Sequence, residues 1–258
     1  MDKDKVELTF LGTGTSQGVP MIGCHCEVCM SCDKRDKRLR SSVFVETRGI
    51  SLVIDTGPDF RYQMLRAKVE SLDAVLYTHG HKDHTAGMDD LRAFNYVQDR
   101  PVDIYCRPEV EDILRKDFDY AFSEYRYPGV PEINVHTISS QPFTVGGVTI
   151  TPIPGLHYKL PVVGFRIGAL CYLTDMNFIE EPVIDSLRGI GILVINALRR
   201  GKHISHFSLD EALEVIRKIK PGRAYLTHIS HQLGKYEDVM RELPTGVELA
   251  YDKLKIEI

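Results

Sequence analysis

The segment THGHKDHTAG constrains this chain more than any other part of its sequence. It places His79, His81, Asp83 and His84 within six residues, directly after the apolar run DAVLYT, which predicts a buried strand. His79 and His81 occupy alternate positions where the strand ends, and a turn then lets Asp83 and His84 point elsewhere. Three imidazoles and a carboxylate at this density indicate a metal site that can serve two adjacent cations, rather than a polar surface turn.

Strands and helices alternate along the chain, and strands outnumber helices. Apolar, β-branched runs predict strands at residues 6–12, 42–47, 51–55, 73–78, 102–106, 148–153, 164–168, 170–174, 192–197, 223–227 and 247–258. Helices are expected at 88–97 and 208–220, the second opening on a capping box of Ser208 and Glu211. Most neighbouring strands could form hairpins, for example at Arg48-Gly49. The pattern favours layered sheets with helices outside, in one α/β domain spanning residues 1–258.

The composition is that of an ordinary soluble globule, with 43% apolar and 26% charged residues. The formal net charge of −4 gives no global attraction to nucleic acid or anionic lipid. The N-terminal residues lack a long apolar run, and no stretch approaches the roughly 20 apolar residues of a membrane span. We therefore expect a cytoplasmic protein with no membrane association.

Four of the six cysteines lie within nine residues: Cys24, Cys26, Cys29 and Cys32. In a reducing cytosol such a cluster favours a metal over disulfides. The spacing C-x-C-x₂-C-x₂-C suits four thiolates on one tetrahedral zinc. Reduced, inert cysteines in a loop are the alternative.

The His-x-His-x-Asp-His motif, with LTFLGTGTSQG, LVIDTGPD, YLTD and LTHISH around it, resembles the metallo-β-lactamase fold superfamily over almost the whole chain. Within it, GTGTSQGVP, GCHC..C and THISHQ most resemble the cyclic phosphodiesterases of the carbon–phosphorus lyase (phosphonate) pathway. The likeness to the pyrroloquinoline-quinone biosynthesis protein of the same fold is weaker. The resemblance implies an αββα sandwich with its site at the edges of the sheets.

The resemblance also implies a set of ligands for two divalent cations, Zn²⁺ or Mn²⁺, with Fe also compatible. It assigns one cation to His79, His81 and His157, and the other to Asp83, His84 and His228, with Asp175 bridging the two. Asp55 is expected to orient a ligand imidazole, although a turn aspartate at a strand end is the alternative.

Two cations roughly 3.5–4 Å apart can hold a bridging hydroxide and clamp an in-line displacement at phosphorus. The loop LRRGKHISHFS precedes the capped helix, and in the resembling phosphodiesterases a histidine just before this helix acts as general acid. His206 fits that position, and we expect it and Asp83 to be the catalytic residues. The alternative for His206 is a residue of a solvated basic loop.

For the cysteine cluster, the resemblance implies a structural zinc held by Cys24, Cys26, Cys29 and His231. The spacing alone favours Cys32 as the fourth ligand, so the choice between His231 and Cys32 stays open. His231 follows His228 by three residues at the end of an expected strand. In an extended segment they would point to opposite sides, toward two different metals, whereas a helical turn would place them on one face.

We predict a dinuclear metallohydrolase acting on small cyclic or nucleotide-like phosphodiesters. An RNA-processing nuclease of the same superfamily is one alternative, and the negative net charge of the chain argues against it. A non-hydrolytic carrier, as in quinone-cofactor biosynthesis, is another, and the complete ligand set argues against it. A homodimer is left open. The aromatic residues of segment 117–131 could line the site or pack in the core.

Overall fold

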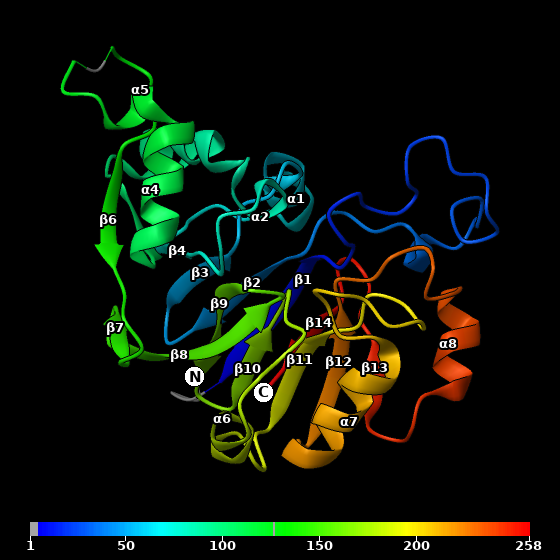
Figure 1. Ribbon diagram of the computed structural model, residues 1–258. Helices are drawn as coiled ribbons and strands as arrows, with labels where there is room; N and C mark the ends of the chain where they lie inside the picture. The colour runs from blue at the N-terminus through cyan, green and yellow to red at the C-terminus, as the bar shows by residue number, and fades with distance from the viewer. Residues whose placement is uncertain (1–4, 126) are drawn as a thin grey trace.

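The computed structural model describes residues 5–125 and 127–258, which form two seven-stranded sheets packed face to face with helices on both outer faces (Figure 1). The predicted αββα sandwich is confirmed. Strands in the middle of each sheet, such as Ala74–Leu76 and Ile192–Asn196, are buried along their whole length. A sheet covered by helices on one side and by another sheet on the other needs apolar side chains on both faces, which explains these uninterrupted apolar runs.

The first sheet has the strand order β14-β1-β2-β3-β4-β5-β6. Its strands are β1 (Val6–Gly12), β2 (Ser42–Thr47), β3 (Ile50–Ile54), β4 (Ala74–Leu76), β5 (Val102–Cys106), β6 (Ile133–Thr137) and β14 (Lys255–Glu257). The second sheet has the order β13-β12-β11-β10-β9-β8-β7. Its strands are β7 (Phe143–Val145), β8 (Val148–His157), β9 (Leu160–Ile167), β10 (Leu170–Leu173), β11 (Ile192–Asn196), β12 (Arg223–Thr227) and β13 (Val247–Leu249).

Each sheet is half antiparallel and half parallel. Hairpins join β2 to β3, β7 to β8 and β8 to β9, and the first turns at Arg48 and Gly49, both with positive φ, as the sequence indicated. The expectation that most neighbouring strands form hairpins is wrong for β3 to β6 and for β10 to β13, which run parallel. Parallel neighbours need crossover connections, and helices supply most of these.

The helices divide between the two outer faces, as Figure 1 shows. One face carries α1 (Phe60–Ala67), α2 (Lys82–Thr85), α3 (Arg92–Gln98), α4 (Pro108–Asp117) and α5 (Asp119–Phe122). The other carries α6 (Glu181–Ser186), α7 (Leu209–Ile219) and α8 (Tyr236–Glu242). Short 3₁₀ turns lie at Lys34–Asp36 and Met88–Leu91. The capping box at the start of α7 is confirmed, because the Ser208 and Glu211 side chains each bond the other's backbone N–H.

Apolar side chains fill the space between the sheets and the space under each helical layer. Leu8, Phe10 and Val45 of the first sheet face Phe165 and Tyr172 of the second, all in one buried cluster. Separate clusters lie under α1 to α5 and under α6 to α8. The sheets are therefore fixed against each other, and the ends of their strands are held at defined positions.

The exit of β3 is held against the α2 turn by two backbone hydrogen bonds, from Thr56 N to His84 O and from Gly87 N to Thr56 O, both 2.8 Å. The approach is close enough to require glycine, because a Cβ on Gly57 would lie 2.2 Å from Asp83 O. This contact sets the turn that carries Asp83 and His84 beside the end of the neighbouring strand.

The C-terminal segment differs from the single strand expected for 247–258. β13 pairs in the second sheet and β14 in the first, so the chain crosses between the sheets in between. Asp252 lies in that crossing, where its carboxylate accepts hydrogen bonds from Thr13 N and Leu39 N and pairs with Arg66. Among the residues that the structure describes, no helix is long and apolar enough to cross a membrane.

Candidate metal centre

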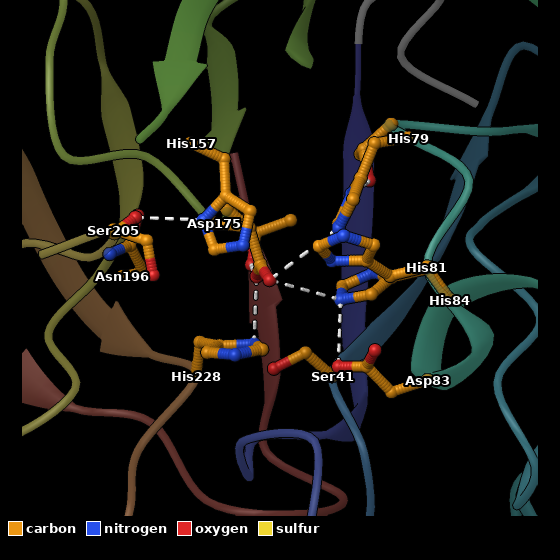
Figure 2. Close-up of polar contacts among 12 residues, drawn as sticks. Ser41, His79, His81, Asp83, His84, His157, Asp175, Asn196, Ser205 and His228 are labelled. Carbon is orange, nitrogen blue, oxygen red and sulfur yellow. Dashed lines mark hydrogen bonds and ion pairs between the residues drawn. The ribbon is translucent and has the colours of Figure 1, made fainter. Parts of the chain in front are cut away.

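The side chain of Asp175 lies at the centre of the site, just beyond β10 (Figure 2). Its Oδ2 is 3.4 Å from His84 Nε2 and 3.7 Å from His79 Nε2, and its Oδ1 is 2.9 Å from His228 Nδ1. His79 is a predicted ligand of one cation, and His84 and His228 are predicted ligands of the other. One carboxylate thus faces imidazoles of both sets, as a bridging ligand would.

The structure brings together all seven residues of the predicted dinuclear site. His79, His81 and His157 form one group, and Asp83, His84, Asp175 and His228 form a second, with the donor atoms of each group within 4.8 Å of one another. The residues come from the exits of β4, β8, β10 and β12 and from the α2 turn. The carboxyl ends of parallel strands meet at one edge of a sheet, which explains why residues far apart in sequence converge here.

Hydrogen bonds behind the ligands fix which ring nitrogen faces the centre. His79 Nδ1 lies 3.0 Å from Thr78 Oγ1, and that hydroxyl donates to Asp55 Oδ2, so the ring nitrogen is the donor to Thr78. His157 Nδ1 donates to the Ser205 carbonyl at 2.7 Å. Protonation at Nδ1 leaves the lone pair on Nε2, the form in which imidazole binds a metal.

Asp55 fixes the ring orientation of His84 in the same way, because His84 Nδ1 donates a hydrogen bond to Asp55 Oδ2 at 2.7 Å. Asp55 is fully buried and also accepts from Thr78 N at 2.9 Å. Burial raises the pKa of this carboxyl, although His84 and Thr78 oppose the shift. These contacts place Asp55 where the predicted orienting carboxylate should be, and they make it more than a turn residue.

In the part of the chain that the structure describes, several buried histidine nitrogens in and around the centre have no hydrogen-bond partner: His79 Nε2, His84 Nε2, His228 Nε2 and His206 Nδ1. His228 Nδ1, although near Asp175, also lacks hydrogen-bond geometry. A buried polar atom without a partner is costly, and histidine lone pairs among carboxylates suit a divalent transition metal. The donor set therefore fits two divalent cations.

The electrostatics of the site indicate the same need for positive charge. Burial would lower the pKa of His84, but Asp175, Asp55 and Asp83 raise it well above the usual range. The pKa of Asp175 is held well below its usual range by His228 and His84, against the effect of burial. Three carboxylates around one imidazole hold a cation of some kind at neutral pH.

Three residues at the site lie in left-handed backbone conformations just beyond strands: Asp55 (φ 65°) and His228 (φ 53°) directly after β3 and β12, and Asp175 (φ 57°) two residues after β10. Few residues other than glycine adopt this region, although aspartate and histidine tolerate it better than most. The sharp turn lets the Asp175 and His228 side chains leave their strands toward the common centre, and it lets Asp55 reach His84 from behind. Asn196 holds the turn after Asp175, because its side chain accepts from Met176 N and donates to Met176 O.

Sequence reasoning missed the residues that support the ligands, namely Thr78, Asn196 and the carbonyl of Ser205. Thr78 and Asn196 are buried polar residues at the ends of apolar strands, and that position was an available signal. Nothing in the sequence near Ser205 indicates its bond to His157, because the two are 48 residues apart.

His206 lies at the edge of the centre and is 8% exposed. A ring nitrogen of His206 lies within 4.8 Å of donor atoms of His157 and Asp175. Its ring stacks on that of His228, with centroids 4.9 Å apart. The position fits a proton donor at the metal centre and also fits a further ligand, but not a residue of a solvated loop.

The structure also groups Cys24, Cys26, Cys29 and His231. His231 Nδ1 is 3.3 Å from both Cys24 Sγ and Cys26 Sγ. The pKa of Cys26 is lowered to about 6 by the backbone N–H of Cys29 and by His231. Cys32 is exposed and lies outside the group, so the geometry favours His231 as the fourth ligand of the predicted zinc.

His228 and His231 face two different groups, as expected for an extended segment, but the physical reason is different. The left-handed turn at His228 ends β12, and Ile229 then bridges to Gly14 of the N-terminal loop. The segment is therefore neither a continuing strand nor a helical turn. The turn directs His228 into the centre and lets the chain run on to the cysteine loop.

Most of the aromatic segment packs into the core rather than lining the site. Phe118 is buried beneath the outer helices, and Tyr120 and Phe122 pack against the same cluster. Tyr125 and Tyr127 are exposed. Core packing is thus the better interpretation for the first half of 117–131.

Comparison with known proteins adds to this geometry. A family model described as a β-lactamase superfamily domain matches residues 51–229, which contain all seven residues of the predicted dinuclear site. A crystal structure described as a new diphosphatase from the PhnP family is 39% identical, with a TM-score of 0.93 over 98% of this chain and 97% of that chain. Zn²⁺-bound PqqB from Methylobacterium extorquens has a TM-score of 0.76 at 21% identity, over 98% of this chain and 100% of that one, a likeness of fold alone.

An octanoyltransferase from Porphyromonas gingivalis (strain ATCC BAA-308 / W83) is 40% identical over 95% of this chain. The chain spans about half the length of that protein, 50%. Because the other half is not covered, the name of the whole protein says nothing about the chemistry at this site.

Replacing Asp55 with asparagine tests its role behind His84. The new side chain would keep the shape of aspartate and tolerate the left-handed backbone, but its amide nitrogen would compete with the oxygen for the place that faces the His84 N–H. We expect Asp55→Asn to weaken Zn²⁺ or Mn²⁺ binding about 10- to 100-fold, as measured by competition with a chromogenic chelator. Asp99→Asn is the matched control, since Asp99 is exposed and has φ 51°. Equal affinities of Asp55→Asn and wild type would contradict the assignment.

The cysteine group gives a second prediction. His231→Ala should lose one bound zinc per chain and lower the melting temperature, because the site ties the N-terminal loop to a segment about 200 residues away, and such clips restrict the unfolded chain. Cys32→Ser should keep its zinc. Native mass spectrometry of both variants measures the stoichiometry, and zinc loss in Cys32→Ser alone would show that His231 is not the ligand.

Proposed function

The chain belongs to the metallo-β-lactamase superfamily, close to the PhnP family, and from this premise we propose that it is a dinuclear metal-dependent phosphodiesterase acting on small cyclic or nucleotide-like phosphodiesters. The observation that carries the proposal is Asp175, whose two oxygens face the histidines of both donor groups. Two divalent cations bound there would activate water and stabilise charge on the phosphoryl oxygens. The likeness to a diphosphatase supports chemistry at phosphorus.

The cationic loop after β11 supports an anionic substrate over a neutral lactam. Among the described residues, Arg199 donates only to neutral acceptors, namely the carbonyls of Gly201 and Lys202 and the side chain of Gln232. Arg200, by contrast, is neutralised by Glu242. Lys202 is exposed and, within residues 5–125 and 127–258, makes no ion pair. Two cations without carboxylate partners in the loop that also carries His206 would attract a phosphodiester anion.

His206 is proposed to protonate the leaving oxygen as the P–O bond breaks. Burial, with nearby His228, His157 and His203, lowers the pKa of His206 to about 3, while Asp175 opposes the shift. The imidazole is therefore neutral in the free site at neutral pH. A phosphodiester anion bound beside it favours the charged form and raises this pKa toward the working range.

Asp83 is proposed to act as an ionised ligand and not as an acid. Burial would raise its pKa, but His84 and His228 hold it well below the usual range. Its Oδ2 lies 3.2 Å from His84 Nε2, on the side of the centre opposite His157 (Figure 2). A carboxylate in this state accepts protons and binds cations but has no proton to give.

The two rival functions make different demands. A carrier that binds without hydrolysis has no need for two complete donor groups around one shared carboxylate. A nuclease for structured RNA needs an extended basic surface, and this chain has a formal net charge of −4. A precursor-tRNA cleavage assay separates the nuclease from the proposed enzyme.

Hydrolysis of bis(p-nitrophenyl) phosphate by the Mn²⁺- or Zn²⁺-loaded protein tests the function. We expect turnover by wild type and at least a ~100-fold lower kcat/KM in Asp175→Asn. Removing the shared negative charge should weaken cation binding and raise the activation free energy by several kcal/mol. Asparagine tolerates the left-handed backbone, so the fold should persist, and Asp99→Asn should keep full activity. No turnover by metal-loaded wild type would contradict the proposal.

The role of His206 is tested by the leaving group. His206→Ala should slow cleavage of alkyl phosphodiesters by about 10²–10⁴-fold and that of nitrophenyl esters far less, because nitrophenolate leaves without a proton. Metal content should be unchanged. Loss of a cation in this variant would show that His206 is a ligand instead, and equal losses for both substrates would exclude proton donation. His136→Ala, at an exposed position, is the control.

A further inference from the structure

Three large apolar side chains stand exposed around the metal centre. Tyr158 and Phe178 are each 49% exposed and Ile204 is 66% exposed. Each is close in sequence to a residue of the centre: Tyr158 follows His157, Phe178 follows Asp175 by three residues, and Ile204 precedes His206 by two. Single exposed apolar residues are common, but three around one polar centre need a reason.

The segments that carry these side chains are joined to one another at His157. Leu156 N donates to Phe178 O at 3.0 Å, and Asn177 N donates to Leu156 O at 2.9 Å. Tyr158 N donates to Asn177 Oδ1 at 2.6 Å. The third segment is joined through His157 Nδ1, which donates to Ser205 O. Tyr158, Phe178 and Ile204 are therefore carried by segments that meet at His157, and we call these three exposed residues the apolar rim.

The backbone of the apolar rim is ordered although its side chains are exposed. Tyr158 occupies the tight β8–β9 turn with φ 57°, and Phe178 lies in a bridge to β8. Within the described part of the chain, neither Tyr158 nor Phe178 packs against another aromatic ring. Rigid, exposed aromatic rings can stack on a flat ligand at little cost in conformational entropy.

Positive charge accompanies the rim. Lys159 Nζ lies over the Tyr158 ring, 5.3 Å from its centroid, and within the described residues it makes no ion pair. Lys202 is two residues before Ile204. Besides the candidate ligands for cations that would bind a phosphoryl group, this part of the molecule offers exposed aromatic rings and lysines that make no ion pair among the described residues. That combination matches a nucleotide, in which a base is attached to a phosphate through a sugar.

We propose that Tyr158 and Phe178 bind the nucleobase of the substrate, with Ile204 completing the apolar rim, so that the enzyme prefers phosphoesters of nucleosides to those of bare sugars. The inference rests on the proposed function and narrows its substrate class. A sugar phosphate without a base would reach the donor groups but leave the rim in water. Discrimination between the two classes is therefore a property of these side chains.

Binding of AMP and of ribose 5-phosphate to the metal-loaded protein, measured by isothermal titration calorimetry, tests the proposal. Both ligands carry the same phosphate, and only AMP carries a base. Wild type should bind AMP more tightly. Tyr158→Ala and Phe178→Ala should each weaken AMP binding about 5- to 150-fold, the range for loss of one base-stacking contact, and leave ribose 5-phosphate binding unchanged. Tyr158→Phe should retain AMP affinity.

Tyr125→Ala is the control, because Tyr125 is 93% exposed and outside the rim. Unchanged ribose 5-phosphate binding also shows that each variant is folded with its centre intact. The proposal is overturned if wild type binds both ligands equally, if the rim variants lose both equally, or if they lose neither. Turnover of bis(p-nitrophenyl) phosphate by wild type with any of these results would retain the phosphodiesterase and reject only the base site.

Discussion

The shared carboxylate of Asp175 is the interaction on which the arrangement of the site depends. It is 2% exposed and lies within 3.7 Å of nitrogens from His79, His84 and His228, which come from two separate segments, the turn after β4 and the exit of β12. A buried negative charge surrounded by histidine lone pairs is stable only with positive charge beside it. The site is therefore built to hold cations, and the left-handed turn at Asp175 with its clamp from Asn196 serves to keep that carboxylate in place.

The sandwich provides what this interaction requires. β3, β4, β10 and β12 end at one edge. Sharp turns after β10 and β12 send Asp175 and His228 to the common centre, and the turn after β3 places Asp55 behind His84. Packing between the sheets fixes the separation of the donors, because side chains such as Phe165 and Tyr172 leave the sheets little freedom to slide. The cysteine group, Cys24, Cys26, Cys29 and His231, includes a residue only three positions beyond His228, so a zinc there would stabilise the segment that carries a ligand of the centre.

Much of this could be predicted from the sequence, because it depends on local patterns. His79 to His84 form a compact motif after an apolar strand, and His157, Asp175 and His228 each end an apolar run. The parallel halves of the sheets were not predicted, since strand direction depends on crossover connections that periodicity does not show. The bond from His157 to Ser205 and the turn at His228 depend on tertiary contacts, with Ser205 and with Gly14, that no short window contains. The spacing of the residues did not show which of them would bind the same cation. The resemblance of the motifs to the metallo-β-lactamase superfamily provided that assignment.

Anomalous X-ray diffraction from crystals of the metal-loaded protein, collected above and below the metal absorption edges, tests the central claim most directly. We expect two peaks of anomalous-difference density in the centre, each marking one metal ion. One peak should be contacted by His79, His81 and His157 and the other by Asp83, His84 and His228. Oxygens of Asp175 should contact both. A single peak there, or two peaks of which Asp175 touches only one, would contradict the account.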